Sequence, residues 1–168
     1  MKKIISLCLT TALLIASLYT GTATADAAAS ASAPSQPEIG EIEYLDNGDY
    51  VVTTITDDPV SPSDITTLAT KKWKTSTKTK RYYNASNEVL WTAAIRATFW
   101  YDGSSSACTY DLAIATAPGS TWSIKSKSSS RSGSTATAKV TATHKGATLS
   151  QDYTATVKIS CTKAGVVS

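Results

Sequence analysis

The fold is decided by residues 89–99, which read VLWTAAIRATF. Apolar side chains occupy the odd positions from Val89 to Phe99, whereas Thr92, Arg96 and Thr98 fall on even ones. This alternation is typical of a β-strand with one face buried and one in water. We therefore predict a strand here, with the odd positions facing a core.

A turn at Asp102-Gly103 shifts the apolar residues of the next segment to even positions. A two-residue turn requires that shift, because otherwise the two strands of a hairpin would bury opposite faces. The pattern predicts Phe99 opposite Ser106 and Trp91 opposite Ile114. The apolar even positions are Cys108, Tyr110, Leu112 and Ile114.

A second parity change at Lys145-Gly146 predicts another hairpin, with Val140 opposite Gln151. Between the two hairpins, Trp122 opens a short strand that we expect to end in a serine-rich loop over residues 128–133. An initial Thr/Lys strand over residues 71–83 and a turn at residues 84–87 complete six strands.

Six antiparallel strands with one apolar face each have to cover that face. We predict an all-β fold: an antiparallel two-layer β-sandwich, immunoglobulin-like or related, with a barrel as the other way to close the core. Asn47-Gly48 favours an additional N-terminal hairpin. The predicted core comprises Trp91, Ile95, Leu112, Ile114, Trp122, Val140, Tyr153, Val157 and Ile159.

Four regions are expected along the chain. Residues 1–25, with Lys2 and Lys3 before an apolar run and Ala23-Thr24-Ala25 at its end, are typical of a signal peptide, and a membrane anchor would need a longer run. Residues 26–40 have the composition of a disordered leader. Residues 41–70 are interpreted as an acidic hairpin with a linker or as a pro-segment, and residues 71–168 as a basic β-sandwich domain.

Charge is divided sharply between the two halves of the chain after residue 25. Residues 26–64 contain nine acidic residues and no Lys or Arg, whereas residues 65–168 contain fourteen Lys or Arg and four acidic residues. The net charge of +3 hides this division. The asymmetry indicates either an anionic partner for the basic part or an acidic arm that masks it.

Two surface features are candidate binding sites. The first is a basic face on the first strand of the domain, a candidate polyanion site formed by Lys72, Lys74, Lys78 and Lys80. The alternative for these lysines is a solvated edge strand that resists aggregation. The second is aromatic: Trp100 and Tyr82 have outward parity and are candidate exposed rings for stacking on a sugar or anchoring a protein, unless a covering layer makes Trp100 part of the core.

Cys108 and Cys161 remain after removal of the predicted signal peptide, and export would place them in an oxidising compartment. We predict a disulfide between them. The order Cys108, Trp122, Cys161 is reminiscent of an immunoglobulin core, but no Tyr stands two residues before Cys161.

No catalytic or metal-binding motif is present in the sequence. The basic domain offers one His and four acidic residues at spacings that suggest no catalytic pair, and His144 is interpreted as a half-exposed residue at a strand end. We expect a protein that is not an enzyme, with no catalytic residues, no metal and no cofactor.

Several short motifs resemble a group of small, exported, β-rich proteins of Gram-positive anaerobic bacteria that are left uncharacterised. They include residues 47–55 (NGDYVVTTI), 89–92 (VLWT), 99–103 (FWYDG) and 122–124 (WSI), and the likeness extends over most of residues 41–168. It implies export and an all-β fold, and it supplies no catalytic residue.

The expected function is that of a non-enzymatic secreted β-sandwich module that binds at the cell envelope or an extracellular surface. Its expected partner is an anionic cell-wall polymer, a glycan or a surface protein, and not a nucleic acid; no transmembrane segment is expected in the mature chain. The alternative is a cationic, bacteriocin-like secreted effector with an acidic masking pro-segment. Oligomeric state does not follow from the sequence.

Overall fold

The structure, a computed structural model, describes residues 40–59 and 71–168. The predicted signal peptide, the predicted leader up to residue 39 and residues 60–70 of the predicted linker lie outside the described residues. The described residues form eight strands: β1 (Glu41–Tyr44), β2 (Tyr50–Asp57), β3 (Lys72–Tyr83), β4 (Val89–Tyr101), β5 (Ser106–Thr116), β6 (Trp122–Ser132), β7 (Thr135–Lys145) and β8 (Ser150–Ser160).

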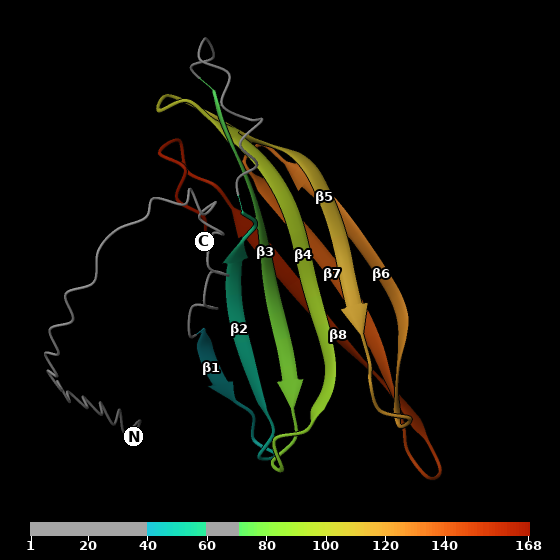
Figure 1. Cartoon of the computed structure of the whole chain (residues 1–168). Coiled ribbons are helices and arrows are strands. Elements are labelled where there is room, and N and C mark those ends of the chain that lie inside the picture. Colours follow the sequence, from blue (N-terminus) through green and yellow to red (C-terminus); the bar gives the residue numbers. More distant parts are fainter. Residues whose placement is uncertain (1–39, 60–70) are drawn as a thin grey trace, which may run out of the picture. The chain divides into compact units, whose positions relative to one another are not determined.

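The strands form two antiparallel sheets that pack on each other (Figure 1). The first sheet has the order β1-β2-β3-β4-β5 and the second has the order β6-β7-β8, so that neighbours in space are neighbours in sequence. The expected all-β, two-layer antiparallel architecture is confirmed. The Greek-key strand order of immunoglobulin domains is absent from the described strands, since both sheets are simple meanders.

The core lies between β4 and β5 of the first sheet and all three strands of the second. The predicted odd face of β4 is confirmed, because Trp91, Ile95 and Phe99 are fully or almost fully buried. Val140, Val157 and Ile159 are also buried, as predicted. Alanines at positions 93, 97, 136, 138, 142 and 155 fill the space between these larger side chains and let the sheets approach closely.

The predicted inner face of β5 is wrong beyond Cys108. The turn after β4 contains four residues, because Tyr101 pairs with Ser106, and a β-bulge then places Phe99 opposite Cys108 but Thr98 opposite Tyr110. The extra residue, Thr109, reverses the parity of the rest of the strand. As a result Ala113 is buried, whereas Leu112 and Ile114 face outward and are 41% and 36% exposed.

The second predicted hairpin has the right faces and the wrong register. Lys145 pairs with Ser150 across a four-residue turn, which places Val140 opposite Ala155 and not opposite Gln151. A shift by an even number of residues keeps every side chain on its predicted face. The core of this hairpin is therefore unaffected.

The predicted serine-rich loop over residues 128–133 is also wrong. Strand β6 continues to Ser132, which pairs with Thr135 across Gly133 and Ser134. Gly133 has a φ of 53°, a left-handed conformation that glycine adopts at no steric cost. Pairing with the buried strand β7 makes this segment a strand in spite of the low β-propensity of serine.

The acidic segment is part of the first sheet. All eight residues of β2 pair with β3, from Tyr50 opposite Tyr83 to Asp57 opposite Ser76, and β1 pairs with the other side of β2. Strand β3 therefore lies between β2 and β4. It is not a solvated edge strand, which was the alternative interpretation of its lysines.

Candidate functional site

The four lysines predicted to bind a polyanion lie on one face of β3, and that face points inward. Lys74 is paired with Phe99, Lys78 with Ile95 and Lys80 with Ala93, and directly paired residues share a face of the sheet. Lys72 is exposed at the start of the strand, whereas the other three are partly buried. These lysines line the inner side of the sheet beside β8, the edge strand of the second sheet.

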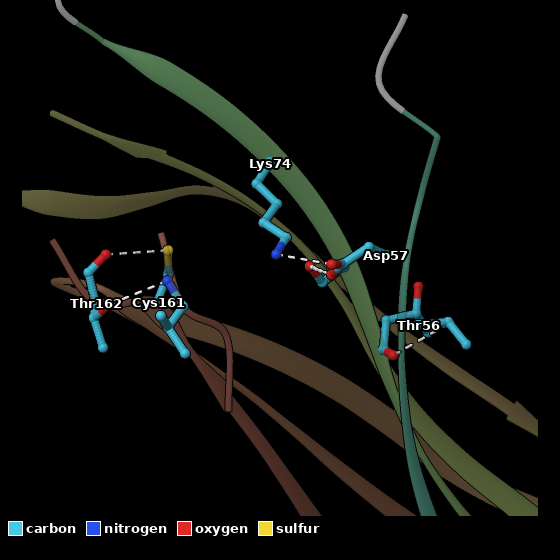
Figure 2. Close-up of polar contacts among 8 residues, drawn as sticks. Thr56, Asp57, Lys74, Cys161 and Thr162 are labelled. Atoms are coloured by element: carbon cyan, nitrogen blue, oxygen red, sulfur yellow. Dashed lines mark hydrogen bonds and ion pairs between the residues drawn. The ribbon is translucent and has the colours of Figure 1, made fainter. Parts of the chain in front are cut away.

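Acidic residues of the hairpin share this face. The Lys74 ammonium lies 2.8 Å from the Asp57 carboxylate, which also accepts a hydrogen bond of 2.6 Å from the Ser76 hydroxyl (Figure 2). Burial would raise the pKa of Asp57, but the hydrogen bonds from Lys74 and Ser76 and the charge of Lys74 together lower it. The register also places Glu41 and Glu43 on the same face, across β2 from Lys80 and Tyr82. The basic face is thus partly neutralised from within.

The two candidate exposed aromatic residues are both half-buried. Trp100 does point away from the core, but the Lys71 ammonium covers its ring at 4.2 Å from the ring centre. Its cross-strand neighbour Trp73, 47% exposed, is the outward ring that the sequence reasoning missed. Tyr82 is directed inward and stacks on Trp91, so the expectation of an outward Tyr82 is wrong. The register between β3 and β4 explains both directions, because it pairs Trp73 with the outward Trp100 and Tyr82 with the inward Trp91.

Tyr82 belongs to a row of aromatic rings that joins the two sheets. Tyr82 and Trp91 are parallel with centres 4.1 Å apart, and Trp91 and Trp122 follow at 6.2 Å. Trp122 also packs against Tyr153 at 5.2 Å and against His144 at 4.8 Å. His144 is half-buried at the end of β7, as predicted.

An open cavity of about 160 Å³ lies beside this aromatic row, at the end of the sandwich near the β1–β2 turn. We call it the end pocket. Both sheets and the acidic hairpin contribute to its wall, so that it depends on residues far apart in the sequence. The wall consists of five aromatic residues (Tyr82, Tyr83, Trp91, Trp122 and Tyr153), two leucines (Leu45 and Leu90) and three polar residues (Asn47, Asp49 and Thr154).

The polar groups of the end pocket are held by neighbours. The Asn47 amide donates a hydrogen bond of 2.8 Å to the Asp49 carboxylate, and the Asp49 backbone N–H returns one of 3.2 Å to the Asn47 side chain. The Thr154 hydroxyl is 3.1 Å from that of Thr141. Gly48, with a φ of 86°, permits the turn that brings Asn47 and Asp49 to the pocket.

The one charged side chain of the end pocket wall is negative. Asp49 is the carboxylate of the wall, and no Lys or Arg belongs to the wall. The pKa of Tyr82 is raised, first by burial and second by the negative charge of Glu43.

The cysteines are buried, and the structure records both as free thiols, so the predicted bridge is not formed in it. Their backbone N–H groups donate to consecutive carbonyls of the β6–β7 turn, Cys108 to Gly133 at 2.8 Å and Cys161 to Ser134 at 3.0 Å. The Cys108 thiol donates to the Tyr110 carbonyl. The Cys161 thiol donates to the Thr162 carbonyl (Figure 2). Burial raises the pKa of both thiols.

Within residues 40–59 and 71–168, no group of three His, Cys, Asp or Glu side chains is placed to hold a metal ion. The same residues contain no helix that is long and apolar enough to cross a membrane. In comparisons with known proteins, no protein family, no curated protein and no solved structure matches the chain. The resemblance to exported proteins of Gram-positive anaerobes stays an expectation.

Proposed function

We propose that the protein is a non-enzymatic binding module that acts at the cell envelope or another extracellular surface, with the end pocket as its binding site. The observation that carries the proposal is the aromatic wall of that pocket, formed jointly by the hairpin and both sheets. Binding sites are commonly concave, mostly apolar and aromatic, with a few placed polar groups. The end pocket has this composition.

The chemistry of the wall supports binding over catalysis. General acid–base chemistry needs a proton donor and acceptor in reach of the ligand, usually a pair of titratable groups. Asp49 is the one acidic residue of the wall, and its carboxylate accepts a hydrogen bond from Asn47. An extracellular location rests on the signal peptide expected from the sequence.

Retention of the full chain on purified envelope fractions tests the proposal. We expect the wild type to be retained and Tyr153→Leu, which removes a 40%-exposed ring of the pocket, to lose most of that retention. Tyr110→Leu is the matched control, because Tyr110 is 48% exposed on β5 and is not part of the wall. Equal retention of wild type and Tyr153→Leu would exclude the end pocket as the site.

The cationic effector is kept as a second candidate because the acidic hairpin covers the edge of the lysine-bearing strand. Strand β2 pairs along β3, and Asp57 forms an ion pair with Lys74. In this interpretation the hairpin masks the basic face until it is cleaved off. The intact mass of the protein from culture medium separates the candidates: a chain that begins near Lys71 supports the effector, whereas a chain that keeps the hairpin supports the binding module.

A further inference from the structure

We propose that the ligand group bound in the end pocket is a small organic cation of the alkylammonium class, such as a trimethylammonium head group. This inference rests on the proposed function and names the ligand class of the same site. Three independent features of the wall support it: the aromatic rings, the charge and the state of the polar groups.

The first feature is the number and arrangement of the rings. The face of an aromatic ring attracts a cation, most strongly for Trp, and several rings around one space form a cage that suits an alkylated ammonium. Trp91 and Trp122 are inclined by 20° to each other, and Tyr153 is inclined by 52° to Trp122. Trp91 is 2% exposed and packs against Tyr82 and Trp122, so the rings that a ligand can reach are mainly those of Trp122 and Tyr153, whose planes differ by 52°.

The second feature is charge. Asp49 supplies a carboxylate at the wall, and Glu43, across β2 from Tyr82, is a second negative charge that acts on a ring of the wall. Two cations lie nearby without forming the wall: Arg81, whose guanidinium is 3.4 Å from the Tyr83 hydroxyl, and Lys80, the preceding inward residue of β3. With a carboxylate in the wall, a cation is favoured over an anion.

The third feature is the hydrogen-bonding state of the wall. Asn47 and Asp49 bind each other, Thr154 contacts Thr141, and the Tyr153 hydroxyl donates to Gln151 at 3.0 Å. A sugar ring would need several polar partners that these pairings already engage, whereas a trimethylammonium group has no hydrogen to donate. The cavity of about 160 Å³ is also below the roughly 300 Å³ of pockets for drug-sized ligands, and suits a head group.

A titration of the full chain with choline, followed by the indole N–H resonances of its four Trp residues, tests the inference. We expect saturable shifts for Trp91 and Trp122, which line the pocket, and none for Trp73 and Trp100, a cross-strand pair on the opposite face of the sheet. The neutral isostere 3,3-dimethylbutan-1-ol has the same shape as choline and no charge. It should bind at least about tenfold more weakly.

Two variants test the role of the carboxylate. Asp49→Asn keeps the hydrogen-bonding shape of the turn and removes the charge, and should weaken choline binding about tenfold. Asp46→Asn removes the same charge from an exposed position of the same turn that is not part of the wall, and should change the affinity less than twofold. Unchanged indole spectra without ligand show that both variants are folded.

The outcomes separate this inference from the proposed function. Equal binding of choline and its neutral isostere, or shifts with N-acetylglucosamine and none with choline, would overturn the cation assignment. Retention on envelope material that choline fails to compete also overturns it and leaves the binding module intact. Conversely, choline binding in the pocket without any envelope retention supports the cation and overturns the proposed cellular role.

Discussion

At the scale of single residues, Asp57 links the acidic hairpin to the basic strand. Its carboxylate binds both Lys74 and Ser76, the one buried polar residue among the described residues. Ser76 is fully buried, and a buried hydroxyl without a partner would destabilise the fold. The hydrogen bond from the Ser76 hydroxyl to Asp57 removes that cost. Asp57 therefore satisfies the one buried hydroxyl on the lysine-bearing inner face of β3.

The lowered pKa of Asp57 predicts a pH dependence of stability. A carboxylate with a depressed folded-state pKa contributes stability above its unfolded pKa of about 4, and this is lost as pH falls through the folded value. Asp57→Asn should cost about 0.5 to 1 kcal/mol at pH 7, since the pair is half-exposed, and little at pH 2. Urea unfolding at both pH values measures this, with Asp46→Asn as the control. An equal loss at both pH values would contradict it.

The buried thiols predict low reactivity. Both cysteines are free, buried and bonded to carbonyls, and burial raises the pKa of each. Since the thiolate is the reactive form, native protein without the predicted signal peptide, and hence without Cys8, should react slowly with a thiol reagent. The same protein, denatured and unreduced, should then titrate two thiols. No thiol in the denatured sample would show instead that Cys108 and Cys161 form the bridge expected from the sequence.

At the scale of elements, the buried face of a strand can be predicted as far as its apolar and polar residues alternate without interruption. The alternation along residues 89–99 is uninterrupted, and β4 is correctly predicted together with its buried face. A single bulge at Thr109 reverses the alternation in β5, and no residue type announces a bulge there. Turn lengths were also missed, since four-residue turns replace the expected two-residue ones. Local chemistry defines the strands, whereas pairing geometry sets the register.

The reversal in β5 predicts contrasting effects of two substitutions. Ile95→Ala removes a fully buried side chain and should cost about 3 to 4 kcal/mol. Leu112→Ala, which the uninterrupted pattern would have placed in the core, should cost less than about 1 kcal/mol because Leu112 is 41% exposed. Chemical denaturation of both variants provides the comparison. A large loss for Leu112→Ala would mean that the bulge is misplaced.

The candidate site was predictable only in part, for a related reason. The lysines of β3 were found from their spacing, but their inward direction follows from the pairing with β4. Trp91 and Trp122 lie in or against the core as predicted and pack on each other, whereas Tyr153, also predicted in the core, is 40% exposed and packs against Trp122 at the pocket. Nothing in the sequence indicates that the turn carrying Asn47 and Asp49 meets them, because that contact joins three separate hairpins.

At the scale of the whole described fold, the hairpin of β1 and β2 connects structure to function. It extends the first sheet, pairs with the lysine-bearing strand and completes the end pocket with Leu45, Asn47 and Asp49. Opposite charges at Asp57 and Lys74 assist this docking, but the backbone ladder between β2 and β3 carries it. Backbone hydrogen bonds are far less sensitive to salt than exposed ion pairs.

Amide hydrogen exchange across β2 measures whether the hairpin is paired with β3 in solution. We expect the amides of residues 50–57 that pair with β3 to be protected at the level of their β3 partners, at both low salt and about 1 M NaCl, where charges are screened beyond about 3 Å. Exchange of these amides at the rate of an unfolded peptide, while β4 stays protected, would contradict the account: residues 41–57 would then be a detached acidic arm, and the end pocket would lack one of its walls.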